Sequence, residues 1–148
     1  MEDLTTQFKG KITEMQVALA LLQKGYMVSQ PLVDARYDFL LEVNGKFYRI
    51  QVKTCHSNRS DEYFEIDTQT SHTNCEKTVH LSYSKNEVDF FATIYNGICY
   101  LIPYDICGKR SQRLRLLPTK NNQTKGIVFA KDYTLDNILN SLCDAYDK

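Results

Sequence analysis

Several features that would assign a protein to a special class are missing from this chain of 148 residues. Its formal net charge is zero, so the overall charge balance does not indicate a nucleic-acid binder. No apolar run approaches the ~20 residues that a membrane span needs. Residues 1–6 lack the basic start and apolar stretch of a secretory signal. We therefore expect a cytoplasmic, intracellular protein that has no membrane partner.

The cysteines suggest neither a disulfide framework nor a zinc site. Their number is odd, their spacing is irregular and no C-x-x-C pair occurs. They are Cys55, Cys75, Cys99, Cys107 and Cys143. Reduced thiols in a cytosolic protein are the expected state.

What the chain does contain is typical of one ordinary globular domain, and we expect residues 1–148 to form it. Hydrophobic residues make up 43% and charged residues 24% of the chain, which excludes a disordered protein. The pattern reads as a helix, then several strands, then a helix. This order predicts an α/β or α+β fold.

Residues 6–24 are predicted to form an amphipathic helix that Thr5 or Thr6 caps and Gly25 ends. Its apolar residues recur every three or four positions, which is the spacing of the core-facing side of a helix. They are Phe8, Ile12, Met15, Leu19 and Leu22, and Val17, Ala18 and Leu21 widen the stripe. Glu14 lies along this stripe and not on a clearly solvated face.

The remaining elements follow from alternation and turn signals. Strands are expected near residues 26–31, 37–43, 46–53, 63–66, 78–83, 88–95, 98–103 and 111–116. Residues 26–31 would form an edge strand. Residues 90–95 are apolar on both faces and would therefore form a central strand. Residues 68–74 look like a flexible tract, residues 120–126 like an exposed loop, and a second helix is expected from Thr134.

Asn44-Gly45 is the strongest local signal, because it lies between two apolar-rich runs at residues 37–43 and 46–53. This dipeptide favours a two-residue hairpin turn, in which both central residues take a positive φ. Pairing of Val43 with Lys46 then fixes the register of the whole hairpin.

In that register Asp38 lies opposite Gln51, and Arg36 lies opposite Lys53. Directly opposed residues share one face of a sheet, so these four side chains gather on one side. The other face is an apolar layer suited to a core, made of Tyr37, Phe39, Leu41, Val43, Tyr48, Ile50 and Val52.

A carboxylate, an amide and a lysine at one end of a hairpin are suited to metal-dependent cleavage of phosphodiester bonds. Mg²⁺ prefers oxygen ligands and keeps several waters. Asp38, Gln51 and the main-chain carbonyl of Val52 offer such oxygens, and Lys53 can stabilise charge on the scissile phosphate. Glu14 would add a second carboxylate if the first helix packs beside the hairpin. The alternative is a solvated sheet face on which these charges pair weakly.

A basic stretch runs through residues 106–131, where seven lysines and arginines occur without an acidic residue. It is either a solvated face or a nucleic-acid contact surface. Arg113 and Arg115 share one face if residues 111–116 form a strand. Lys120, Asn121, Asn122, Gln123 and Lys125 crowd the following loop.

Glu14, Asp38, Gln51 and Lys53, in this order, resemble the site motif of the PD-(D/E)XK nuclease superfamily. Tyr37 stands where proline is usual, and Gln51 stands where Glu or Asp is usual, which removes one negative charge. Over about residues 9–133, the sequence resembles one branch of this superfamily, the group I intron-encoded homing endonucleases of cyanobacterial type. The segments that carry this likeness are residues 24–26, 36–38, 47–54, 88–91, 100–103, 114–116 and 118–127.

The resemblance implies one restriction-endonuclease-like domain with a mixed central sheet flanked by helices. It implies a DNA endonuclease that uses Mg²⁺, or alternatively Mn²⁺, and acts on double-stranded DNA as a homodimer or homotetramer. It implies that Lys53 is the catalytic lysine. The residues that would bind the metal are Asp38, Gln51, Val52 and Glu14. Arg36 and the basic stretch, including Arg113, Arg115 and residues 120–125, would contact DNA.

Two other functions remain open from the sequence. One is a structure-specific Holliday junction resolvase on the same fold. The other is a non-catalytic DNA-binding module whose nuclease site has decayed, as Gln51 would suggest.

Overall fold

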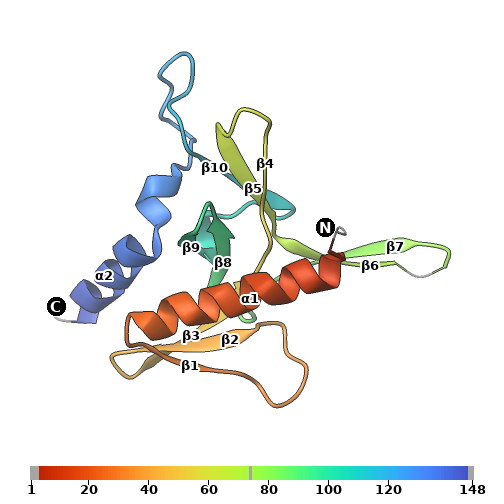
Figure 1. Cartoon of the computed structure of the whole chain (residues 1–148), viewed down its shortest axis with the longest axis vertical. Helices are drawn as coiled ribbons and strands as arrows, with labels where there is room; N and C mark the ends of the chain where they lie inside the picture. Colours follow the sequence, from red (N-terminus) through yellow and green to blue (C-terminus); the bar gives the residue numbers. More distant parts are fainter. Residues whose placement is uncertain (1–3, 74, 147–148) are drawn as a thin grey trace.

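A mixed five-stranded sheet forms the centre of the molecule (Figure 1), and the computed structural model describes residues 4–73 and 75–146 of the chain. The strands are β1 (Met27–Ser29), β2 (Phe39–Val43), β3 (Lys46–Val52), β8 (Phe90–Tyr95) and β9 (Ile98–Pro103), in the order β1-β2-β3-β8-β9. Only the β3–β8 pair is parallel. The predicted edge position of β1 and central position of β8 are therefore confirmed.

The two hairpins of this sheet follow from their turn residues. Asn44 and Gly45 have φ of 52° and 78°, and Asn96 and Gly97 have 49° and 78°. Positive φ at both central positions matches the twist of the flanking strands. Val43 pairs with Lys46, as predicted, and this register continues to Phe39 opposite Ile50.

Strands β8 and β9 of the sheet are buried on both faces. One face packs in a core with helix α1 (Thr6–Gln23) and helix α2 (Leu135–Tyr146). The other packs against a second core that includes Phe64, Ile66 and Leu114. Strand β8 serves both, since Phe90 and Ala92 join the first core and Phe91 joins the second. Alternation along a strand buried on both faces produces this arrangement.

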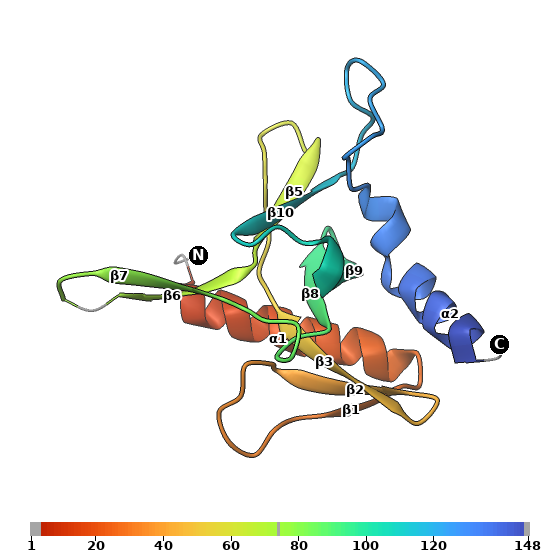
Figure 2. The same cartoon turned by 180° about the vertical axis from the view of Figure 1, so that it is seen from behind.

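A smaller sheet of β10 (Ser111–Arg115), β5 (Tyr63–Asp67) and β4 (His56–Ser57) supplies the second core. Figure 2 shows this sheet above the central strands, on the side away from β1 and β2. Two short 3₁₀ segments, Tyr104–Ile106 and Ala130–Tyr133, lie before β10 and before α2. The strands predicted at residues 63–66 and 111–116 are confirmed.

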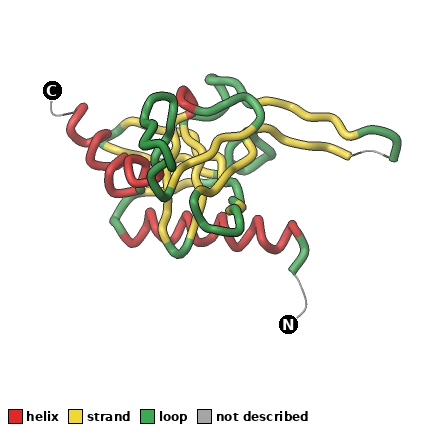
Figure 3. Tube along the Cα trace, turned by 90° about the horizontal axis from the view of Figure 1, so that it is seen from above, coloured by secondary structure: helices red, strands yellow, loops and turns green. Residues whose placement is uncertain are grey.

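Strands β6 (Gln69–Thr73) and β7 (Thr78–Ser82) pair as a hairpin, which we call the arm. Figure 3 shows the arm extending well beyond the body of the molecule. The expectation of a flexible tract at residues 68–74 is wrong for β6. Polar residues there pair along β7. Local hydrophobic alternation does not show this pairing, because none of the side chains of the arm that the structure describes is buried.

Helix α1 begins and ends where the sequence predicts, but it is rotated from the predicted orientation. Thr5 caps it by accepting a hydrogen bond from the Phe8 amide, and Gly25 follows its end with φ of 83°. Thr13, Val17 and Leu21 are its buried residues. Of the predicted stripe, Val17, Ala18 and Leu21 lie in the core, as expected. Its five other residues are exposed instead: Phe8 is 62%, Ile12 43%, Met15 64%, Leu19 55% and Leu22 55% exposed.

The side of α1 that faces the sheet carries two alanines and two larger apolar residues. Ala18 and Ala20 pack beside Val17 and Leu21 against the first core. A stripe of large residues on the other side therefore remains available for something outside the chain. None of the helices in the described ranges is long and apolar enough to cross a membrane.

Candidate active site

Asp38 immediately precedes β2 and is held in place by β3. Its amide donates to the Ile50 carbonyl at 2.8 Å, and its Oδ2 accepts from the Val52 amide at 2.8 Å. The paired register of the hairpin ends at Phe39 opposite Ile50, and the Asp38 amide bonds to the carbonyl of that same Ile50, so the predicted pairing of Asp38 with Gln51 stays a prediction. The carboxylate is thus fixed by main-chain atoms and not by a mobile side chain.

The surroundings of Asp38 disfavour its negative charge. Burial raises the pKa of this carboxyl most strongly, and the Glu14 carboxylate raises it further. The hydrogen bond from Val52 and the charges of Lys53 and Lys11 oppose this rise without cancelling it. A carboxylate whose charged form is disfavoured in this way would be stabilised by a bound cation.

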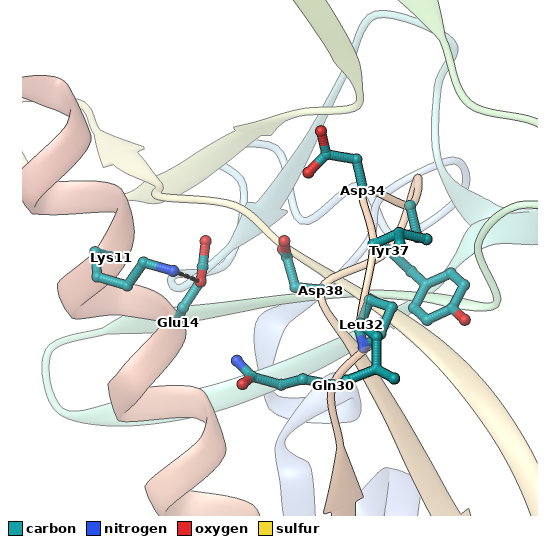
Figure 4. Close-up of a pocket in the computed structure, with 10 residues that line it drawn as sticks. Lys11, Glu14, Gln30, Leu32, Asp34, Tyr37 and Asp38 are labelled. Carbon is teal, nitrogen blue, oxygen red and sulfur yellow. Dashed lines mark hydrogen bonds and ion pairs between the residues drawn. The ribbon is translucent and has the colours of Figure 1, made fainter.

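Glu14 reaches the same place from α1, which the sequence alone could not establish. The helix is anchored over the end of β3, where the Thr13 and Thr54 hydroxyls lie 3.3 Å apart. Lys11 binds Glu14 at 2.6 Å, and the Glu14 side chain is 22% exposed. Figure 4 shows both side chains extending from α1 toward the segment that carries Asp38.

A cavity of about 310 Å³ opens between α1 and the segment from Gln30 to Asp38. Lys11, Glu14, Asp34 and Asp38 are the charged residues of its lining. Sequence reasoning missed Asp34 and Lys11, because neither belongs to a recognisable motif. The sequence signal for Lys11 is its position three residues before Glu14, a spacing that favours ion pairing on a helix.

The oxygen atoms near Asp38 suit a hard divalent cation. Glu14 and Asp38 supply carboxylates, and the Gln51 side chain lies beside the Val52 carbonyl, to which its amide nitrogen donates at 3.4 Å. Within residues 4–73 and 75–146, three or more His, Cys, Asp or Glu side chains do not converge on one point. The donor set therefore fits Mg²⁺ or Mn²⁺, which accept few carboxylates and retain waters, better than it fits zinc.

Lys53 follows β3 and lies on the same side as Asp38, whose pKa its charge lowers. Its Nζ donates to the Gln69 carbonyl at 3.2 Å and lies 4.9 Å from the centroid of the Tyr83 ring. The ammonium is thus close enough to Asp38 to affect its charge while being held by the first residue of the arm.

Arg36 is near Lys53, as the register predicts, but its guanidinium is already engaged. It binds Glu87 at 2.6 Å, the Thr70 hydroxyl at 3.1 Å and the Ser82 carbonyl at 3.2 Å. Its side chain is 33% exposed. In the structure, Arg36 joins the segment that carries Asp38 to the arm. A contact between Arg36 and DNA stays a prediction.

The two arginines of β10 differ in availability. Arg113 is 61% exposed, pairs with Glu65 at 2.7 Å and covers the Tyr63 ring. Arg115 is only 19% exposed and donates to the carbonyls of Leu117 and Pro118. Arg115 therefore supports the loop that follows β10, while Arg113 presents its charge to solvent.

The loop from 117 to 126 projects from one end of the molecule (Figure 1). Lys120, Asn121, Asn122, Gln123 and Lys125 are all exposed. The loop is shaped by its own polar groups, since the Thr119 hydroxyl donates to the Gln123 carbonyl at 2.9 Å and Asn121 accepts from the Gln123 amide at 3.2 Å. A polar loop ordered in this way presents donors outward.

Comparison with known proteins agrees with this arrangement. The structure of a bacterial homing endonuclease, I-Ssp6803I, matches with a TM-score of 0.74 and 23% sequence identity over 97% of each chain. At this identity the likeness shows the shared fold. No curated protein sequence matches the chain significantly. The family model of the PD-(D/E)XK endonuclease matches residues 4–136, which include the helix carboxylate, the hairpin and the lysine, and the chain therefore belongs to the PD-(D/E)XK endonuclease family.

Proposed function

We propose that this protein is a Mg²⁺-dependent endonuclease that cuts double-stranded DNA at a specific site, as a homing-type enzyme does. The observation that carries the proposal is the meeting of Asp38, Glu14 and Lys53 at the open end of one hairpin. Two of these residues are adjacent to β2 and β3, and the third comes from a helix anchored over them. The likeness to a homing endonuclease supports the site-specific form of the activity.

Each residue has a separate task in phosphodiester hydrolysis. Asp38 and Glu14, with the Gln51 side-chain oxygen and the Val52 carbonyl, would hold the ion. Bound Mg²⁺ supplies an activated water and neutralises charge on the phosphoryl oxygens. Lys53 stabilises the extra negative charge that develops as water attacks phosphorus and the bond to the leaving oxygen breaks.

The exposed cations of the basic stretch are suited to hold DNA. Arg113, Lys120 and Lys125 would contact phosphates, which supply affinity without sequence information. Asn121, Asn122 and Gln123 carry amides of the kind that read adenine edges in the major groove. Specific recognition would thus come from the loop, and cleavage from the hairpin.

We also propose that two copies of the chain associate through α1, which gives one cleavage site for each DNA strand. The exposed residues Phe8, Ile12, Met15, Leu19 and Leu22 are spaced by four, three, four and three. This is the spacing of a coiled-coil seam, which buries itself against another helix. A soluble monomer rarely leaves such a continuous apolar stripe uncovered.

The charges beside the seam favour an antiparallel pair of helices. Lys9 and Lys11 flank its first half, whereas Gln16 and Gln23 flank its second half. A parallel pair would set the lysines of both copies together, and an antiparallel pair sets them against the neutral half. In the register with greatest overlap, Phe8 lies opposite the partner's Leu19 and Ile12 opposite the partner's Met15.

Cleavage-site selection from a random duplex library, with Mg²⁺ at a fixed salt concentration, tests the proposed function. A four-way DNA junction with arms drawn from the same library serves as the competing substrate. We expect recovery of a single pseudo-palindromic duplex sequence. Preferred cutting of the junction without sequence choice would show a resolvase, and DNA binding with no cutting in Mg²⁺ or Mn²⁺ would show a non-catalytic module.

A further inference from the structure

Tyr83 occupies the point where the arm, the sheet and Lys53 meet. It follows the last residue of β7 and is 7% exposed, and its ring meets Phe91 of β8 edge-on at 5.5 Å. Packing in the second core explains why the ring is buried. It does not explain the two cations that lie against it.

The ring of Tyr83 contacts two cationic side chains, those of Arg36 and Lys53. The Cζ atom of Arg36 lies 4.1 Å from the ring centroid, and the Nζ atom of Lys53 lies 4.9 Å from it. Both distances are within the range in which an aromatic face attracts a cation. The ring therefore offers negative electrostatic potential to two neighbouring positive charges that would otherwise repel each other.

The ring is itself fixed by hydrogen bonds from separate elements. The Thr70 hydroxyl donates to the Tyr83 phenol oxygen at 2.8 Å, and the Tyr104 hydroxyl donates to the Tyr83 carbonyl at 2.9 Å. Arg36 donates to Thr70 as well, at 3.1 Å. Tyr83 thus has little freedom to move with respect to β3 and the arm.

Lys53 is held by this frame without using all of its donors. An ammonium has three N–H groups, and the Gln69 carbonyl accepts one of them at 3.2 Å. The aromatic face provides a second contact that consumes no donor. The other N–H groups remain for the phosphate. Because the long lysine side chain is already held in place, it has less rotamer freedom left to lose during the reaction.

We propose that Tyr83 is a positioning residue for Lys53: its ring face, fixed by Thr70 and shared with Arg36, holds the ammonium beside the carboxylates. The catalytic meaning of this contact rests on the proposed nuclease function. The contact also joins the lysine to both strands of the arm, since Gln69 and Thr70 lie in β6 and Tyr83 follows β7.

Nuclear magnetic resonance tests the contact independently of activity. Because the Lys53 Nζ atom lies 4.9 Å from the ring centroid, the signals of the protons on the neighbouring Cε are expected upfield of ordinary lysine values in the wild-type protein. Tyr83→Phe keeps the ring and should keep the shift. Tyr83→Leu should abolish it, and Tyr83→Met, which is flexible enough to fill the same core space, provides a second non-aromatic variant should the leucine variant not fold.

Single-turnover cleavage tests the consequence. With DNA saturating, Tyr83→Leu or Tyr83→Met should lower the rate about 10-fold to 100-fold, while the DNA dissociation constant changes by less than about 2-fold. Tyr83→Phe should restore most of the rate, which a general loss of folding would not allow. Unchanged lysine signals, or wild-type rates in both non-aromatic variants, would overturn the proposal. A wild-type protein that cuts no DNA would contradict the nuclease function, and the lysine signals would still decide the contact.

Discussion

Among single residues, Gln51 is where this site departs most from the pattern that its family shares. It directly precedes Val52, whose amide donates to Asp38, and its own side-chain amide offers an oxygen without a charge. The carboxylates of Asp38 and Glu14 are therefore the only negative charges among the four groups proposed to hold the ion. Metal affinity should be limited by this missing charge.

Gln51→Glu is expected to lower the Mg²⁺ concentration for half-maximal cleavage by roughly 10-fold, because ligand charge tunes the affinity of oxygen sites. Cleavage measured over a Mg²⁺ titration at constant ionic strength checks this. Asp34→Asn, which changes a carboxylate at the rim of the same cavity, is the control and should leave the midpoint nearly unchanged. An unaltered midpoint in Gln51→Glu would mean that residue 51 does not contact the ion.

Lys120 and Lys125 allow the DNA-binding surface to be tested at the level of individual charges. Replacing both by alanine should weaken binding to all sequences alike and reduce the slope of log K against log salt by about 1.8, at ~0.9 for each phosphate contact. Fluorescence anisotropy at several salt concentrations measures this slope. Lys85→Ala, a lysine 73% exposed on another part of the surface, is the control. A slope equal to that of the wild type would exclude the loop from the interface.

The sequence was sufficient to place some of the site residues and not others. Asp38, Gln51 and Lys53 follow from one turn, because hairpin register is a local property. The sequence could not place Glu14, because its position depends on how α1 is rotated about its axis. That rotation is set by packing against a sheet that is distant in the sequence. Tyr83 had no sequence signal, since its contacts with Arg36 and Lys53 join segments far apart in the chain.

At the level of elements, β3 and the start of β8 are joined by a reciprocal contact between Arg49 and Asp89. Arg49 donates to Asp89 from its main chain at 2.7 Å and from its guanidinium at 3.0 Å. The Asp89 amide in turn donates to the Arg49 carbonyl at 3.0 Å. Burial alone would raise the pKa of Asp89, but the hydrogen bonds and charge of Arg49 outweigh it and hold the pKa below the usual 3.8.

A lowered carboxyl pKa stabilises the folded protein above the ordinary value, and this stability is lost as pH falls through the lowered value. Asp89→Asn should therefore reduce the free energy of unfolding by about 1–2 kcal/mol at pH 7 and by much less below about pH 3. Urea unfolding at both pH values measures this difference. Asp105→Asn, an exposed partner of Lys85, should show no comparable effect. An equal loss at both pH values would contradict the charge-assisted role of Asp89.

The elements also show why some predictions failed. The large residues of α1 have helical periodicity, so the sequence assigns them to the core. The core instead takes in the neighbouring residues Val17, Ala18 and Leu21, which the sequence placed at the margin of that stripe. Periodicity identifies an apolar face but not the surface that covers it. Strand β6 was missed for a different reason: it has a partner strand, but none of its described side chains is buried in a core.

For the whole molecule, the family, the endonuclease class and the restriction-endonuclease-like fold predicted from the sequence are confirmed. Assembly stays a prediction. Helix α1, which carries the seam, is 18 residues long, or ~27 Å at 1.5 Å per residue, and the seam presents five exposed large apolar side chains. A surface of this kind should make the oligomer sensitive to single charges.

Met15→Glu is expected to shift the protein toward the monomer, because it places one charge from each copy into the apolar seam. Sedimentation velocity over a range of concentrations measures the change. Met27→Glu is a matched control: Met27 lies on edge strand β1 and is 63% exposed, compared with 64% for Met15. A wild-type protein that sediments as a monomer, or a Met15→Glu variant that associates as well as the control, would exclude this surface.

The central claim is that Asp38 and Lys53 form one metal-dependent site for cutting DNA. Cleavage of a plasmid that carries the selected target, with Mg²⁺ present and again with EDTA, tests it most directly when wild type, Asp38→Asn, Lys53→Ala and Asp34→Asn are compared. We predict that the wild type and Asp34→Asn cut both strands with Mg²⁺ and not with EDTA, and that Asp38→Asn and Lys53→Ala bind the DNA but cut at least ~100-fold more slowly. Cutting at the wild-type rate by either of these two variants would contradict the claim.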